Sequence, residues 1–176
     1  MKNLYQRGDV VFSFEVFPPK TPQGFESLYR TVGELANYKP GFISVTYGAG
    51  GSTQSQTLEI IKEIRSRFQL ATTAHFTLVG ATVPQLIAFL REAQETGADN
   101  IMALRGDPPQ GETKFQPVQG GLSYANELVA LIKEQFPSFG IGVGGYPETH
   151  QEATSPEDDL GHLKRKVDAG ADAIFT

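Results

Sequence analysis

The sequence predicts an α/β fold of the (β/α)8 barrel type, in which parallel strands alternate with helices. Three observations predict it. Short apolar segments alternate with longer segments of helical periodicity, their centres recur about every 30 residues, which is the length of one βαβ unit, and one helix-to-strand turn is repeated. Such alternation is typical of a parallel sheet covered by helices.

The elements follow one another along the chain. Strands are predicted where β-branched and aromatic residues form short apolar runs, at Val10–Phe17, Phe42–Tyr47, Ala71–Thr77, Asn100–Leu104, Ile141–Val143 and Ala173–Phe175. Helices are predicted where apolar residues recur at helical spacing, at Gly24–Ala36, Thr53–Phe68, Val83–Glu95, Ser123–Phe136 and Pro156–Ala169. The chain therefore begins and ends in a strand.

Signals at the helix ends agree with this assignment. Thr82 precedes Gln85 by three residues, as in a capping box, and Ser155 precedes a proline at the first helical position. The turns at Gly97–Asp99 and Gly170–Asp172 both read Gly-Ala-Asp, with a helix-ending glycine that leads into a strand. Repetition of one turn favours a barrel of repeated units.

Polar residues share one parity of the predicted strands. That parity holds Ser13, Glu15, Ser44, Thr46, Thr73, His75, Thr77, Arg105 and Asp107, whereas the opposite parity holds Phe12, Phe14, Val16, Ile43, Val45, Met102 and Leu104. We expect the apolar parity to pack against the helices. The polar parity then points into the barrel and lines a site at its carboxyl-terminal rim.

Composition argues against several classes of function. The net charge of -5 leaves no basic surface for nucleic acid or anionic lipid, and the absence of cysteine excludes disulfides, thiolate metal sites and a cysteine nucleophile. No apolar run is long enough to span a membrane, and residues 1–9 lack the apolar core of a signal peptide. We expect residues 1–176 to form a single cytoplasmic domain with no nucleic-acid or membrane partner.

Glu15 is the first candidate catalytic residue. It lies in an apolar strand between aromatic residues, where a carboxylate is costly to desolvate. Such an environment favours the protonated form and suits a general acid near neutral pH. The alternative is a glutamate paired with a neighbouring Arg or Lys, and the residue pattern alone leaves both open.

Two turns that follow predicted strands are candidate binding loops. Arg105–Pro109 combines a guanidinium that suits phosphate or carboxylate, a glycine that permits close approach to the backbone, and an aspartate before two prolines. Gly48–Thr53 is rich in glycine and opens a helix, where backbone amides bind anions. The alternative for Arg105–Pro109 is an ordinary turn with a surface ion pair, and the alternative for Gly48–Thr53 is a flexible turn.

Three other motifs have simpler explanations. Gly140–Gly145 matches the dinucleotide-binding pattern G-x-G-x-x-G, but it follows a helix and is itself strand-like, so we interpret it as a strand of small residues beside a bulky ligand. The spacing of His75, His150 and His162 fits no metal site. The charged run from His162 to Lys166 is typical of a solvated helix face, although Lys166 could reach a phosphate.

Together these motifs resemble the methylenetetrahydrofolate reductase family. Four blocks occur in the family's order: Phe-Glu-Val-Phe-Pro-Pro-Lys (14–20), Ser-Val-Thr-Tyr-Gly-Ala (44–49), Ala-Leu-Arg-Gly-Asp (103–107) and Leu-Lys-Arg-Lys-Val-Asp-Ala-Gly-Ala (163–171). Ala-His-Phe-Thr (74–77) and Tyr-Pro-Glu-Thr-His (146–150) also fit. The resemblance runs from about residue 10 to the last residue.

The resemblance implies an eight-stranded β/α barrel that binds FAD without a dinucleotide-binding domain. It implies that NADH or NADPH reduces the flavin and that 5,10-methylenetetrahydrofolate then enters the same site, in a ping-pong sequence, to become 5-methyltetrahydrofolate. By the same resemblance, Glu15 corresponds to the general acid that protonates N10 of the folate. Asp107 corresponds to the aspartate that contacts the pterin and lies beside the flavin.

Further positions match the family's flavin contacts. They are Thr46, Tyr47, Ala49, His75, Arg105, Gly106, Asp107, Tyr124, Ala125, Tyr146, His150, Asp159, His162 and Lys166. The resemblance implies that Arg105 and Lys166 neutralise the diphosphate, in place of the solvated face suggested above. Relatives can carry another polar residue at the position of His162.

The chain departs from the family in length. A barrel needs about 250 residues, and the family's next expected residue after Thr176 is a glutamine that binds folate and nicotinamide. We expect these 176 residues to be the first five βα units and a sixth strand of a longer, homo-oligomeric protein, inactive as an isolated piece. The alternatives are a flavin-free pterin-binding barrel of the methyltransferase type and a non-catalytic partial barrel.

Overall fold

The computed structural model describes residues 1, 4–5, 10–47, 54–108, 111–112 and 114–176. Its strands are β1 (Ser13–Val16), β2 (Phe42–Val45), β3 (Thr72–Thr77), β4 (Asn100–Leu104), β5 (Gly140–Gly144) and β6 (Ala173–Phe175). Its helices are α1 (Pro22–Ala36), α2 (Gln54–Phe68), α3 (Val83–Thr96), α4 (Ala125–Gln135) and α5 (Pro156–Asp168). The predicted elements are confirmed, with strands β1 and β2 shorter than expected.

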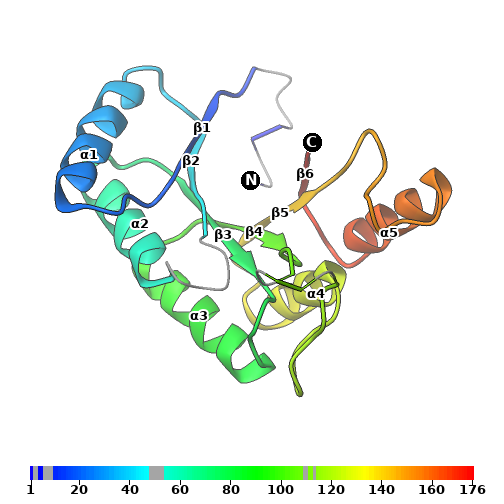
Figure 1. The fold of residues 1–176 in the computed structure, drawn as a ribbon. Helices are drawn as coiled ribbons and strands as arrows, with labels where there is room; N and C mark the ends of the chain where they lie inside the picture. The colour runs from blue at the N-terminus through cyan, green and yellow to red at the C-terminus, as the bar shows by residue number, and fades with distance from the viewer. Residues whose placement is uncertain (2–3, 6–9, 48–53, 109–110, 113) are drawn as a thin grey trace.

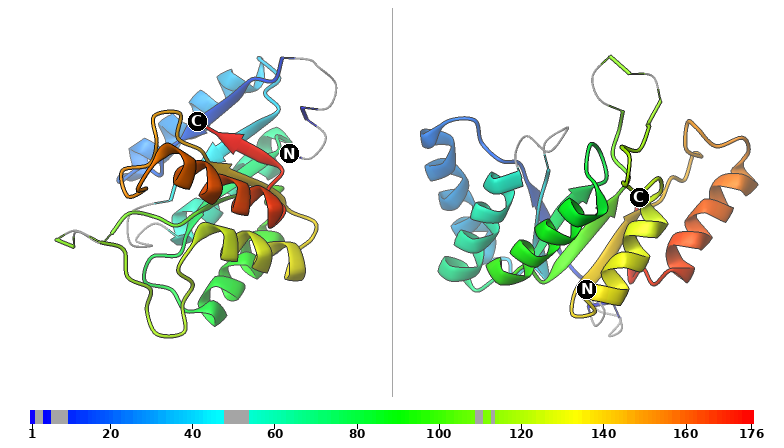
Figure 2. Two further views of the ribbon diagram at one scale, coloured as in Figure 1. Left: turned by 90° about the vertical axis from the view of Figure 1, so that its right-hand side faces the viewer. Right: turned by 90° about the horizontal axis from the view of Figure 1, so that it is seen from below.

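The six strands form one parallel sheet in the order β1-β2-β3-β4-β5-β6, with strands β1 and β6 at its edges. The sheet is curved, and the helices lie along its outer side while the inner side is open (Figures 1 and 2). This is a half-barrel, so the predicted class of a partial (β/α)8 barrel is confirmed. No described helix is long and apolar enough to cross a membrane.

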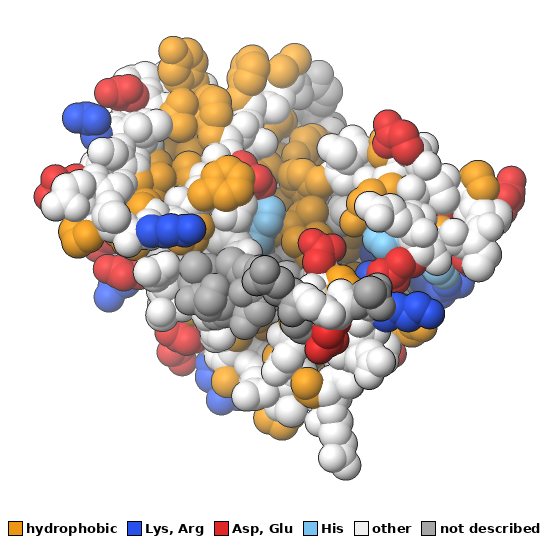
Figure 3. Space-filling model, in the orientation of Figure 1, with side chains coloured by type: hydrophobic (Ala, Val, Ile, Leu, Met, Phe, Trp, Pro, Cys, Tyr) orange, Lys and Arg blue, Asp and Glu red, His pale blue; other side chains and the backbone are white. Residues whose placement is uncertain are grey.

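The main core lies between the outer face of the sheet and the helices. Ile43 and Val45 of β2 are fully buried there, as are Ile61 of α2 and Leu90 of α3. Their burial confirms that the apolar parity of the second strand packs outward. Hydrophobic side chains also remain exposed above the open inner side (Figure 3), and Phe12 and Phe17 next to β1 are among the exposed ones.

The expected parity of β4 is wrong. Met102 pairs in register with His75, so it lies on the inner face with the polar residues. A Cβ added at Gly142 would meet the Phe175 ring at 2.7 Å and Met102 Sδ at 3.1 Å, which places all three on that face. By the same register Leu104 pairs with Thr77, also on the inner face, opposite to the prediction.

The cause of this error lies just after β4. The prediction continued the strand alternation from Met102 through Arg105, whereas the strand ends at Leu104. Gly106 then has a φ of 87°, in the left-handed region, which breaks the alternation. Arg105 and Asp107 therefore take their direction from the turn and not from the strand.

The repeated Gly-Ala-Asp turns form hydrogen bonds at the amino-terminal ends of the strands. Asp99 accepts a hydrogen bond from the backbone N–H of Thr72 at 2.8 Å, and Asp172 accepts one from Ile141 at 2.8 Å. Each carboxylate also meets a cation from a preceding helix: Arg65 reaches Asp99 at 3.4 Å, and Lys133 reaches Asp172 at 3.2 Å. Each aspartate thus ties its own strand to a neighbouring strand and to a helix.

This arrangement predicts that Asp172→Ala lowers the free energy of unfolding by about 2 kcal/mol, because a mostly buried N–H and a partly buried ammonium both lose their partner. The matched control is Asp168→Ala, which removes an exposed carboxylate paired with Lys164 at 2.6 Å. Its cost should stay below about 0.5 kcal/mol. Urea unfolding measures both, and equal costs would contradict the structural role of the turn.

Candidate functional site

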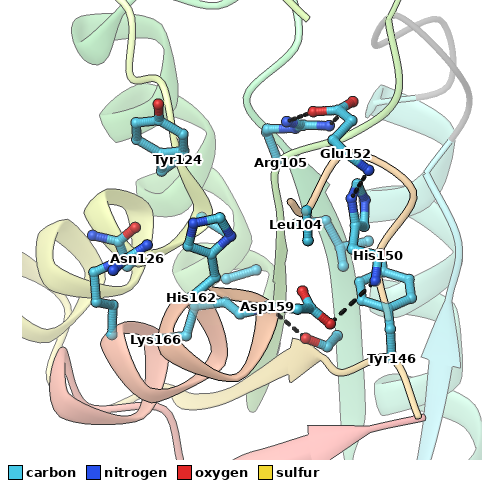
Figure 4. Close-up of a pocket in the computed structure, with 15 residues that line it drawn as sticks. Leu104, Arg105, Tyr124, Asn126, Tyr146, His150, Glu152, Asp159, His162 and Lys166 are labelled. Atoms are coloured by element: carbon cyan, nitrogen blue, oxygen red, sulfur yellow. Dashed lines mark hydrogen bonds and ion pairs between the residues drawn. The ribbon is translucent and has the colours of Figure 1, made fainter. Parts of the chain in front are cut away.

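A cleft of about 570 Å³ opens at the carboxyl-terminal ends of β4 and β5, beside α4 and α5 (Figure 4). Its volume lies within the range of small-molecule sites. Eight of the predicted binding residues line it: Arg105, Tyr124, Ala125, Tyr146, His150, Asp159, His162 and Lys166. The polar residues Asn126, Glu152 and Arg165 also line it and were not predicted.

Lys166 projects from α5 into the wall of the cleft. Its Nζ donates a hydrogen bond to the carbonyl oxygen of Gly144 at 2.5 Å. Burial lowers the pKa of the Lys166 ammonium, and the nearby charge of Asp159 opposes that effect only in part. A half-buried ammonium in the wall of a cleft is not part of a solvated helix face, so that interpretation does not hold for this residue, and its positive charge favours an anion in the cleft.

The loop between β5 and α5 places His150 and Tyr146 side by side, with ring centroids 4.7 Å apart. The His150 backbone N–H donates to Asp159 Oδ2 at 3.1 Å, and His150 Nδ1 accepts from the backbone N–H of Glu152 at 3.1 Å. The proton of the neutral imidazole therefore lies on Nε2. Burial, followed by the charge of Asp107, raises the pKa of the Tyr146 hydroxyl.

Arg105 is paired with a carboxylate, so the turn contains an ion pair, as the alternative interpretation of this motif expected. Its two terminal nitrogens donate to the two carboxylate oxygens of Glu152 at 2.6 and 2.7 Å, and its guanidinium lies 5.2 Å from the centre of the Phe115 ring. The Glu152 carboxylate raises the pKa of Arg105, and the Arg105 guanidinium lowers the pKa of Glu152. No sequence signal singled out Glu152, which lies 47 residues from its partner.

Gly106 and Asp107 lie at the end of β4, outside the lining of the cleft. At Gly106 a Cβ would come within 2.6 Å of Val79 Cγ2 and 2.9 Å of Thr77 Cβ. Its φ of 87° adds to that restriction, so only glycine fits this turn. Asp107 is exposed at the rim, near enough to Arg105 and Tyr146 to shift the pKa of both upward.

A second polar cluster lies on the inner face of the sheet. His75 Nε2 lies 3.1 Å from Glu15 Oε2, and Ser44 Oγ donates to the same oxygen at 3.5 Å. The Glu15 side chain is 46% exposed, whereas that of His75 is 17% exposed. The strong desolvation expected for Glu15 is therefore not found, and its partner is a histidine where the alternative interpretation expected Arg or Lys.

Two further predicted residues, Thr46 and Tyr47, lie outside the lining of the cleft. Thr46 follows β2, and its carbonyl oxygen accepts from Thr57 Oγ1 at 3.0 Å. The ring of Tyr47 packs in the outer core, with centroids 5.9 Å from those of both Phe76 and Phe89. Burial there raises the pKa of the Tyr47 hydroxyl. Ala49, like the whole Gly48–Thr53 motif, lies outside the described residues.

His162 faces an acidic side chain of its own helix, with Nε2 3.4 Å from Asp158 Oδ1. Asp158 also accepts hydrogen bonds from the backbone N–H and the hydroxyl of Thr154, at 3.3 and 3.1 Å, and these lower its pKa. Within the described ranges, no three His, Asp or Glu side chains are grouped so that they could hold a metal ion.

The sequence comparisons with known proteins agree on one family. The family model described as methylenetetrahydrofolate reductase matches residues 1–176. The chain is 41% identical over 186 aligned residues to methylenetetrahydrofolate reductase (NADH) 1 of Arabidopsis thaliana, covering 100% of this chain and 31% of that protein. It is 42% identical over 170 residues to 5,10-methylenetetrahydrofolate reductase of Escherichia coli K12, covering 97% of this chain and 55% of that protein.

The chain thus spans about a third to a half of the length of these relatives. Among solved structures, the carboxyl transferase domain of Rhizobium etli pyruvate carboxylase aligns with a TM-score of 0.60 at 14% identity, covering 93% of this chain and 26% of that chain. An enolase from a Sargasso Sea environmental sequence aligns with a TM-score of 0.53 at 15% identity, covering 92% and 36%. These two likenesses show the fold alone.

The His75–Glu15 contact predicts a pH dependence of stability. Burial lowers the pKa of His75 below its ordinary value of 6.5, and the charge of Glu15 opposes that effect only in part. The unfolded chain therefore binds this proton more readily, so stability falls as pH drops below about 6.5 toward the folded-state pKa. His75→Gln should lose less stability than the parent between about pH 7.5 and about pH 5.5 in urea unfolding. Equal losses would show that burial of His75 contributes nothing.

Proposed function

This chain belongs to the methylenetetrahydrofolate reductase family, and we propose that the protein reduces 5,10-methylenetetrahydrofolate to 5-methyltetrahydrofolate, with NADH or NADPH as reductant and FAD as cofactor. The observation that carries the proposal is a cleft with three cationic side chains at the rim of a half-barrel whose inner face holds a carboxylate beside a histidine. A rim cleft is where barrel enzymes place their sites.

The residues present in the cleft fit the chemistry of FAD. Lys166 and Arg165 line it from one helix, and Arg105 lines it from the end of β4. We propose that these cations hold the diphosphate, because a half-buried ammonium gains most from an anionic partner. Tyr146 and His150 offer ring faces and an Nε2–H for the remaining polar and apolar parts of the cofactor.

Bound FAD would supply the redox chemistry, accepting hydride from the nicotinamide and passing it to the folate's methylene carbon. Glu15 would protonate N10, which opens the five-membered ring and produces a better hydride acceptor. Both described hydrogen-bonding contacts of its carboxylate use Oε2, one with His75 and one with Ser44. His75 thus stands where it can hold the carboxyl in a fixed orientation.

Asp107 would bind the pterin at the rim. It is exposed, and its charge acts on both Arg105 and Tyr146, which line the cleft. A carboxylate in this place can accept hydrogen bonds from the amino-pyrimidine edge of a pterin. Its negative charge near the cofactor would also oppose the build-up of negative charge on reduction.

The two half-reactions would share one site, in a ping-pong sequence. We propose either nicotinamide as reductant; the Arabidopsis relative carries NADH in its name. A cytoplasmic location, a role in one-carbon metabolism and methionine biosynthesis, and assembly of the full-length protein into a homo-oligomer are part of the same proposal.

The proposal predicts that Glu15→Gln abolishes folate reduction selectively. In stopped-flow measurements, oxidation of the reduced flavin by 5,10-methylenetetrahydrofolate should slow by a factor on the order of 10² to 10⁴, because the proton donor is lost. Reduction by NAD(P)H should continue. The control Glu26→Gln changes an exposed glutamate of α1 and should alter neither step.

Survival of both half-reactions in Glu15→Gln would contradict the general-acid role. Colourless protein that also fails to take up added FAD would instead favour a flavin-free pterin-binding barrel.

A further inference from the structure

We propose that Glu152 determines the anion selectivity of the cleft, because its carboxylate and the anionic group of a phosphorylated ligand compete for the guanidinium of Arg105. The inference deepens the proposed function and rests on it for the identity of the ligand, the diphosphate of FAD. Nothing in the sequence motifs or in the family resemblance assigned a role to Glu152.

The geometry of the pair makes it a strong internal interaction. Both carboxylate oxygens of Glu152 accept from Arg105, at 2.6 and 2.7 Å, in a two-pronged arrangement, and both residues line the cleft (Figure 4). Charge-assisted pairs of this kind are roughly twice as strong as neutral hydrogen bonds. A ligand that uses the same guanidinium nitrogens must replace them.

The two partners differ in how firmly they are held. The Arg105 side chain is 21% exposed and lies over the Phe115 ring, whereas the Glu152 side chain is 47% exposed. The half-exposed carboxylate can turn into solvent and become fully hydrated. Moving the guanidinium would instead break its contact with the aromatic ring. Glu152 is therefore the partner that gives way.

The loop does not need this carboxylate to keep its shape. His150 is fixed through its backbone N–H to Asp159, and the backbone N–H of Glu152 is bonded to His150 Nδ1. Thr154 is fixed by its hydrogen bonds to Asp158. None of these bonds involves the Glu152 side chain, so a substitution there changes charge and leaves the loop in place.

The surrounding charges show why the competition selects among anions. The negative charges of Asp107, Asp159 and Glu152 all raise the pKa of Tyr146, and Asp159 and Glu152 line the cleft together with Arg105. Glu152 itself is held by Arg105, with weaker attraction from His150 and Lys114. A diphosphate carries enough charge and oxygen acceptors to replace one carboxylate, whereas a ligand without phosphate gains nothing from doing so.

The test compares flavin binding by the flavin-stripped protein and two variants. Glu152→Gln should bind FAD roughly tenfold more tightly in a fluorescence titration at low salt, because a competing charge is removed. Riboflavin, which lacks phosphate, should bind equally to both. The control Glu148→Gln removes an exposed charge from the same loop and should change neither affinity.

Three results would overturn the inference. They are equal or weaker FAD binding by Glu152→Gln, an equal gain for riboflavin, and a gain that persists when Glu152→Gln is made in the Arg105→Ala background. Thermal unfolding of each variant confirms that it is folded. If neither parent nor variant binds FAD, the proposal that FAD is the cofactor is wrong. Titration with inorganic pyrophosphate then tests whether Glu152 competes with an anion for Arg105. Pyrophosphate that binds no more tightly to Glu152→Gln than to the parent, or does not bind, overturns it.

Discussion

The parallel register of the sheet is the constraint on which the rest of the structure depends. Because all six strands run the same way, their carboxyl ends meet at one rim, and every loop that follows a strand opens toward the same space. Arg105 after β4 and Tyr146 after β5 reach one cleft for this reason. The Gly-Ala-Asp turns maintain the register from the opposite end, where Asp99 and Asp172 accept hydrogen bonds from backbone amides near the start of neighbouring strands.

Two polar regions result, and they divide the chemistry. The rim cleft gathers cations from α5 and the end of β4, which suits a bound anion. The inner face holds Glu15 and His75 at 3.1 Å, which suits proton transfer. Under the proposed function, ligand binding and proton transfer would take place at different parts of one sheet. The cleft holds a half-buried ammonium at Lys166 and a paired guanidinium at Arg105.

Much of the fold could be predicted from sequence, because periodicity and helix-end signals are local. The Ser155 cap was predicted, and its hydroxyl accepts from the Asp158 backbone N–H at 3.1 Å. The face of the sheet on which Met102 lies was not predicted, because the turn at Gly106 ends the alternation of side chains between the two faces without any change in composition. The pairing of Arg105 with Glu152 was missed because partners 47 residues apart are joined only by the fold. Tyr47 shows the opposite case, where a residue matched by motif packs its ring into the core.

The central claim is that the rim cleft holds the diphosphate of FAD through Lys166. The most direct test is equilibrium titration of the flavin-stripped protein and of Lys166→Met with FAD and with riboflavin. The claim predicts one FAD site per chain, an affinity for FAD that falls at least roughly tenfold in Lys166→Met, and unchanged binding of riboflavin. Equal affinity of Lys166→Met and the parent for FAD would contradict it.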